Sequence, residues 1–271
     1  MTFRSPFLVS AHPEMYPPLA ELSLPPPIGS SLLVAYLGGL GLVELLLTVS
    51  VPAAAGGYGL VALAVCIALP HMTDQRSASL LPVLAAIPVV RLATVAAPTA
   101  DFAPLARLGL LAVPTFVAVV AVAHSDTQDR HLLRPGPGGW AEQAALPLVG
   151  VPLGMLVYLL GPPTPQLRGQ APVIAVIALL VLAVIPDELL FRGLLVPAAT
   201  DVAGAAGVPL AAAAYAATFV AYGSMTLLAT AFVVGLVLSW FRQRTGSAVG
   251  VIGARIVVAL LVYLVLPAVW A

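Results

Sequence analysis

Residues 202–241 form a run of 40 residues without a single Asp, Glu, Lys or Arg. As one α-helix the run would be about 60 Å long, at a rise of about 1.5 Å per residue. The hydrocarbon core of a bilayer is only about 30 Å thick, so the run is about twice as long as one crossing needs. We therefore expect two membrane-spanning helices here, with a turn at Gly223-Ser224.

The composition of the whole chain also indicates a membrane protein. Of the 271 residues, 61% are hydrophobic and 8% are charged, whereas about 25% of the residues of a soluble domain are charged. Eleven basic and eleven acidic residues give a formal net charge of zero, so no basic surface is expected that would attract nucleic acid. The composition excludes an ordinary soluble enzyme, a disordered chain and a nucleic-acid-binding protein.

The apolar runs predict an all-α fold, a polytopic transmembrane bundle of eight or nine helices. The expected spans lie at about 30–50, 53–71, 78–97, 105–123, 144–161, 170–194, 207–222, 225–241 and 247–268. Residues 1–28 are rich in proline and are expected to form a flexible N-terminal tail. We divide the rest into N-terminal transmembrane helices, 29–165, and a C-terminal region, 166–271.

The arginines predict the orientation of the bundle in the membrane. With nine spans, six of them fall on one side and two on the other; the six are Arg4, Arg76, Arg130, Arg134, Arg242 and Arg244, and the two are Arg107 and Arg168. Because cytoplasmic loops carry the excess of basic residues, the N-terminus is expected in the cytoplasm. The Ala-, Val-, Gly- and Pro-rich composition, with Arg in place of Lys, favours a bacterial plasma membrane.

Ionisable residues inside the predicted spans are candidates for a functional site, because charges are costly in lipid. Glu44 and Arg91 are expected either to pair with each other or to face a cavity. Asp187 and Glu188 are adjacent, and Arg192 lies one helical turn after Glu188 on the same face. An arginine there can hold a carboxylate ionised and oriented, and such a carboxylate could act as a general base on water.

Two motifs in the C-terminal region resemble the CAAX prenyl protease and bacteriocin-processing family of glutamate-type intramembrane proteases. The first is Asp187-Glu188-Leu189-Leu190-Phe191-Arg192, which is similar to the Glu-Glu-x-x-x-Arg motif of that family. The second is the Arg-Thr-Gly-Ser turn at 244–247, which precedes the last helix of the family. The resemblance implies an intramembrane endopeptidase in which Glu188 activates water, Asp187 assists and Arg192 fixes the carboxylate.

The chain departs from the family pattern at the two histidine positions. Gly223 stands where the Phe-x-x-x-His motif that begins at Phe219 has its histidine, and Arg255 stands at the histidine position of the last helix. Ala259 takes the place of the asparagine that follows, and no histidine occurs after His131. The resemblance implies a divalent metal such as zinc as the family cofactor. Asp187 and Glu188 alone are a poor ligand set for it, so we assign no metal ligand and the cofactor of this chain stays open.

Three functions remain open at this point. In the first, the chain is an intramembrane endopeptidase that acts on membrane-associated peptides or proteins. Alternatively it is a catalytically inactive relative that works as a bacteriocin-immunity factor, scaffold or partner subunit, with the acidic pair and the arginines in a closed ion network. A transporter that uses Glu44, Arg91 and the Glu188 cluster is the third. Membrane lipid is an expected partner in each case, and the oligomeric state stays open.

Overall fold

A computed structural model describes residues 27–69, 75–97, 102–125, 139–161 and 169–270, together with 133, 136 and 167. These residues form helices joined by turns, without a β-strand among them, which confirms the all-α fold. Almost all of the predicted tail, 1–28, lies outside the described residues.

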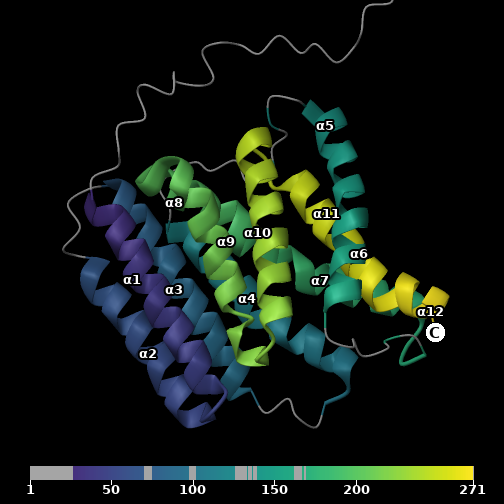
Figure 1. Cartoon of the computed structure of the whole chain (residues 1–271), viewed down its shortest axis with the longest axis horizontal. Helices are drawn as coiled ribbons and strands as arrows, with labels where there is room; N and C mark the ends of the chain where they lie inside the picture. The colour runs from purple at the N-terminus through teal and green to yellow at the C-terminus, as the bar shows by residue number, and fades with distance from the viewer. Residues whose placement is uncertain are drawn as a thin grey trace, which may run out of the picture.

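The helices follow the predicted apolar runs closely (Figure 1). The N-terminal helices are α1 (Pro27–Leu47), α2 (Val51–Ala68), α3 (Gln75–Ala96) and α4 (Pro104–Ser125). A fifth stretch consists of α5 (Gly139–Ala145), the 3₁₀ turn η4 (Leu146–Val149) and α6 (Gly150–Leu160). The C-terminal region contains α7 (Val173–Glu188), η5 (Leu189–Leu195), α8 (Val196–Ala203), η6 (Gly204–Ala206), α9 (Gly207–Ala217), η7 (Val220–Tyr222), α10 (Met225–Thr245), α11 (Val249–Leu260), η8 (Leu261–Val265) and α12 (Leu266–Trp270).

Among the described residues, seven helical stretches are long and apolar enough to cross a membrane, and Ser31–Leu47 of α1 adds a shorter apolar helix. One of the seven, Val173–Tyr222, contains 50 residues. It folds back on itself at Gly204, whose φ of 56° and ψ of −138° favour glycine. The chain is therefore an integral, multi-pass membrane protein, and α9 forms a ninth segment.

The span predicted at 170–194 continues further than expected, to Ala203. The reason is a seven-residue π-helix, η5, which links α7 directly to α8. After Gly204 the chain returns as α9, which packs closely on α8. A Cβ atom on Gly207 would lie 2.5 Å from the carbonyl oxygen of Ala199, so only glycine permits this approach.

The two predicted turns are confirmed. Gly223 has a φ of 65° and ends η7, and the Ser224 side chain then accepts a hydrogen bond from the Leu227 N–H at 3.2 Å, which caps the start of α10. Gly246, with a φ of 68°, ends α10, and its N–H donates to the Arg242 carbonyl oxygen at 3.0 Å.

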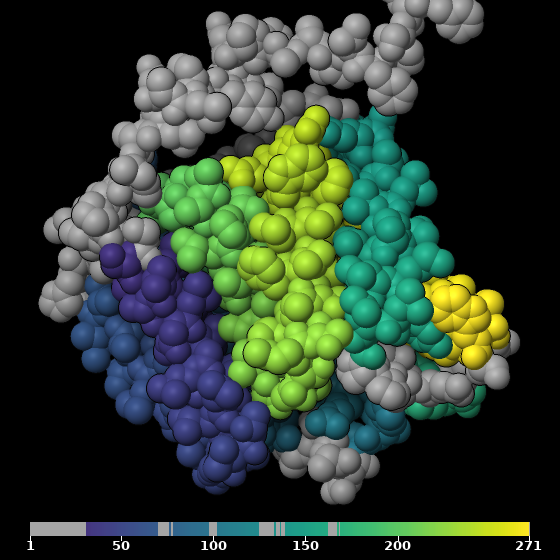
Figure 2. Space-filling model, in the orientation of Figure 1, coloured from purple at the N-terminus to yellow at the C-terminus, as the bar shows by residue number. Residues whose placement is uncertain are grey.

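The N-terminal and C-terminal helices share one core rather than packing separately. The largest cluster of buried apolar side chains joins α1 to α4 with η5, α8 and α9. Smaller clusters join α6, α10 and α11, and α4, α7 and α11. Figure 2 shows α10 between α1 and α9 on one side and α5–α6 on the other. Small residues allow this packing: a Cβ atom on Gly150 of α6 would lie 2.3 Å from the Ala254 carbonyl oxygen of α11.

Candidate functional site

The site is built around the π-helix η5, which begins directly after Glu188. Its backbone bonds reach one residue further than in an α-helix, as when the Val196 N–H donates to the Phe191 carbonyl oxygen. Pro197 has no N–H, so it cannot donate to the carbonyl of Arg192 five residues earlier. The sequence therefore places a proline where it frees one carbonyl group of the π-helix.

Arg242, from the last turn of α10, donates to that carbonyl. Its Nε lies 3.1 Å from the Arg192 carbonyl oxygen, and the residue is 9% exposed. The turn that resembles the family motif at 244–247 thus lies beside the Arg192 segment. From the sequence, Arg242 was predicted only to mark the orientation of the protein. The missing N–H of Pro197 was the signal that could have indicated its role.

Glu188 is held by two arginines. The Nη1 atom of Arg192 donates to Glu188 Oε1 at 3.2 Å, and the Nε of Arg255 lies 3.6 Å from the same oxygen. The side chains are 0% exposed for Glu188, 1% for Arg192 and 25% for Arg255. The interaction of Glu188 with Arg192 was predicted, and the approach of Arg255 decides how the carboxylate is neutralised.

Tyr215 of α9 completes this cluster and was not singled out by our sequence analysis. The guanidinium carbon of Arg192 lies 4.1 Å from the centre of the Tyr215 ring, and the Nη2 of Arg255 donates to the Tyr215 hydroxyl at 3.4 Å. The ring also meets Phe191 and Phe219 edge to face, each at a centroid distance of 5.2 Å. The i, i+4 spacing of Tyr215 and Phe219 could have indicated this aromatic face.

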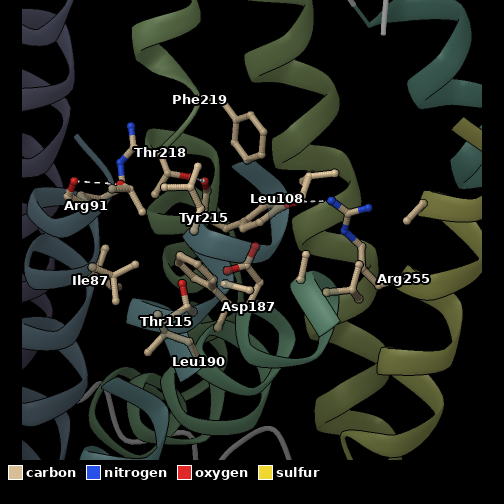
Figure 3. Close-up of a pocket in the computed structure, with 18 of the residues that line it drawn as sticks. Ile87, Arg91, Leu108, Thr115, Asp187, Leu190, Tyr215, Thr218, Phe219 and Arg255 are labelled. Carbon is tan, nitrogen blue, oxygen red and sulfur yellow. Dashed lines mark hydrogen bonds between the residues drawn. The ribbon is translucent and has the colours of Figure 1, made fainter. Parts of the chain in front are cut away.

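A cavity of about 290 Å³ lies beside the cluster, between α3, α4, α7, α9 and α11 (Figure 3). At about 30 Å³ per molecule it has room for about ten waters. Asp187 lines it and is exposed. Within the described residues, no hydrogen bond or ion pair engages the Asp187 carboxylate. Glu188 is not among the lining residues. The predicted ion network thus joins three of its four members, Glu188, Arg192 and Arg255. It is open to the cavity at Asp187 and at Arg255, which also lines the cavity.

A second buried ion pair lies at the side of this cavity. Glu44 of α1, 0% exposed, accepts hydrogen bonds from the Nε and Nη2 of Arg91 of α3 at 2.6 and 2.7 Å. Arg91 also lines the cavity. The expected pairing of Glu44 with Arg91 is confirmed, and helices outside the C-terminal region therefore contribute charge to the site.

The positions of the two family motifs that contain histidine do not all lie at the cavity. Phe219, Arg255 and Ala259 line the cavity. Gly223 is exposed on the turn before α10 and does not line the cavity. A histidine side chain at Gly223 would therefore start from the rim of the bundle, whereas one at 255 would start next to Glu188.

The residues present do not fit a zinc ion. One oxygen of Glu188, Oε1, is already shared by two guanidinium groups, and the other, Oε2, is buried without a hydrogen-bond partner among the described residues. The positive charge of Arg255 beside this carboxylate repels a cation. Within the part of the chain that the structure describes, no group of three or more His, Cys, Asp or Glu side chains could hold a metal.

Residues 169–261 match the family model described as Type II CAAX prenyl endopeptidase Rce1-like. This region belongs to the CAAX prenyl protease family. The match covers α7 to α11, which include the ion cluster, and leaves α1 to α6 outside it. No curated protein matches the chain, and no solved structure does.

The geometry limits what this CAAX protease-family site can do chemically. A general base must reach the water whose proton it takes, within about 3.2 Å. Glu188 has no exposed surface, and two cations stabilise its ionised form. Asp187, in contrast, lines a cavity with room for water. The residue expected to be the base is thus sealed, and the residue expected to assist is accessible.

Proposed function

We propose that the protein is a non-hydrolytic member of the CAAX prenyl protease family, which binds a membrane-associated peptide or protein in the cavity at Asp187. The observation that carries this proposal is the sharing of one Glu188 oxygen by Arg192 and Arg255. In this role Glu188 is a structural counter-ion for two buried guanidinium groups. Removing the charge of either partner from such a pair is costly in a low-dielectric interior.

The cavity supports the binding part of the proposal. Its lining is largely apolar and aromatic, with the Asp187 carboxylate and the Arg91 and Arg255 guanidinium groups among it. Ligand sites in proteins commonly combine an apolar surface with a few polar groups that orient the ligand. The bacterial plasma membrane is the proposed location, with the N-terminus in the cytoplasm.

A second candidate follows from the exposure of Asp187. In this alternative the protein is an intramembrane endopeptidase in which Asp187, rather than Glu188, activates water. The carboxylate has no partner within the described residues, and the cavity has room for a water beside it. A transporter gains no support from these observations, because the Glu44–Arg91 pair is closed by two hydrogen bonds.

One experiment separates these functions without knowledge of the substrate. New N-termini of membrane proteins are compared in cells that produce the wild-type protein, Asp187→Asn, Glu188→Gln or the control Asp201→Asn. Asp201 is an exposed carboxylate on α8, outside the cavity.

The proposal expects the same termini in all four cultures. Termini lost only with Asp187→Asn would establish the second candidate. Termini lost with Glu188→Gln, in a protein that still folds, would show that Glu188 is a catalytic base and would refute the proposal.

A further inference from the structure

The cavity contacts the five helices at different depths, and these depths indicate where it opens. Arg76 is the second residue of α3, and Arg242 and Arg244 lie in the last turn of α10. We call the side of the bundle that carries these three residues the arginine face. Because α3 begins and α10 ends at this face, the α3–α4 connection and the α9–α10 turn lie at the opposite face (Figure 1).

Several lining residues lie close to that opposite face. Thr94 is two residues before the end of α3, and Leu108 is four residues after the start of α4. Tyr222 is the last residue of η7, beside the α9–α10 turn, and it is 66% exposed. The cavity lining therefore reaches an exposed residue at the opposite face.

Toward the arginine face the cavity ends in packed side chains. The lining residues Ile87 and Leu190 are each 1% exposed. Beyond them, α8 and α9 pack through alanines; Ala198, Ala199, Ala203, Ala211 and Ala212 are at most 3% exposed. The buried turn at Thr245 and Ser247, 1% and 0% exposed, lies at the same face. Among the residues that the structure describes, such packing leaves no passage for a ligand.

We infer that the cavity admits its ligand from the face opposite the arginines. With the arginine face in the cytoplasm, as the excess of basic residues predicts, the ligand is an extracytoplasmic segment of a membrane-associated polypeptide. This inference rests on the proposed function, because a binding role gives the cavity a ligand. It places Asp187 at the deep end of a pocket that is wetted from outside the cell.

Cysteine accessibility tests the inference without assuming an orientation. The native Cys66 is exposed on α2 and is first replaced, in a Cys66→Ser background. Thr218→Cys places a thiol in the cavity, and Gln243→Cys places one on the exposed surface of the arginine face. Right-side-out and inside-out membrane vesicles are then treated with a charged, membrane-impermeant maleimide. Thr94→Cys, a second cavity position, is measured in parallel so that the result does not depend on one variant.

The inference expects the cavity thiols to react in right-side-out vesicles and the Gln243→Cys thiol in inside-out vesicles, with complete loss of labelling in the other preparation. The reversed pattern would overturn the extracytoplasmic source of the ligand. Labelling of both kinds of thiol in the same preparation would overturn the inference. Cavity thiols that react in neither preparation, but react after detergent denaturation, would also overturn it. Either failure leaves the proposed function standing, whereas termini that depend on Asp187 or Glu188 would refute that function and leave the access route intact.

Discussion

Replacing Glu188 with glutamine is expected to destabilise the folded protein by about 3–5 kcal/mol, the cost of breaking a buried ion pair from one side. The substitution keeps the shape of the side chain and removes its charge. It leaves the guanidinium of Arg192, whose side chain is 1% exposed, without a counter-ion. Arg255 is less affected, because it is 25% exposed and donates to the Tyr215 hydroxyl.

The distances support this magnitude. At an effective dielectric constant of about 20, Coulomb's law gives an attraction of about 5 kcal/mol for two charges as far apart as Arg192 Nη1 and Glu188 Oε1, which lie 3.2 Å from each other. A glutamine oxygen can still accept one hydrogen bond from Arg192, which offsets part of the loss. The remaining cost is that of a buried, uncompensated arginine in a membrane protein.

The free energy of unfolding is measured for purified protein in detergent micelles by denaturant titration. Asp187→Asn is the matched control, because it removes the charge of the neighbouring carboxylate. Asp187 is exposed and has no partner among the described residues, so this substitution is expected to change the free energy of unfolding little. If Glu188→Gln were as stable as the wild type, or more stable, the reasoning would be refuted. That outcome is typical of a catalytic carboxylate, whose charge is a cost to the fold.

Further substitutions test three other contacts, the first two with the same titration and the third by size-exclusion chromatography. Glu44→Gln is expected to cost about 3 kcal/mol by leaving Arg91 unpaired, whereas the double variant Glu44→Leu, Arg91→Leu recovers most of the loss; a double variant less stable than Glu44→Gln would contradict this. Arg242→Gln removes a charged donor from the Arg192 carbonyl and is expected to cost about 1.5–3 kcal/mol, and an unchanged midpoint would show that the bond contributes nothing. Gly150→Val places side-chain atoms where α6 meets the backbone of α11, so we expect loss of folded, monodisperse protein on size-exclusion chromatography, and a normal yield would refute the close contact.

Much of the architecture could be predicted because lipid restricts it so strongly. Apolar runs of the length of a bilayer gave the spans, and glycine with a following cap residue gave the turn at Gly223-Ser224. The Glu44–Arg91 pair was predictable for the same reason, since a charge inside the bilayer needs a partner. The spans and the turn follow from local signals, and the ion pair follows from the cost of a lone charge in lipid.

The path of the chain after Glu188 was harder to predict. The span expected to end at 194 runs on to Ala203 through a π-helix, because hydropathy does not distinguish a π-helix from an α-helix. Pro197 leaves the Arg192 carbonyl without a donor from its own helix, and Arg242 from the distant helix α10 supplies the donor instead. Such a partner lies 50 residues away in sequence and has no local pattern.

The opposite environments of Asp187 and Glu188 could not be read from their adjacency. Neighbouring residues on a helix point about 100° apart, so one carboxylate faces the cavity and the other faces two arginines. Which one is sealed depends on where α9 and α11 place Tyr215 and Arg255. The motif therefore indicated the place of the site correctly, while the roles of the two acids depend on tertiary packing.

Carboxyl labelling of the wild-type protein tests the central claim most directly, because it asks which acid water can reach. The protein in detergent micelles is treated with a water-soluble carbodiimide and an amine, and modified residues are located by mass spectrometry. Exposed Asp201 is the positive control and fully buried Glu44 the negative control. We predict modification of Asp187 and protection of Glu188 until the protein is unfolded. Modification of Glu188 in the folded protein would contradict the claim that it is a sealed structural counter-ion.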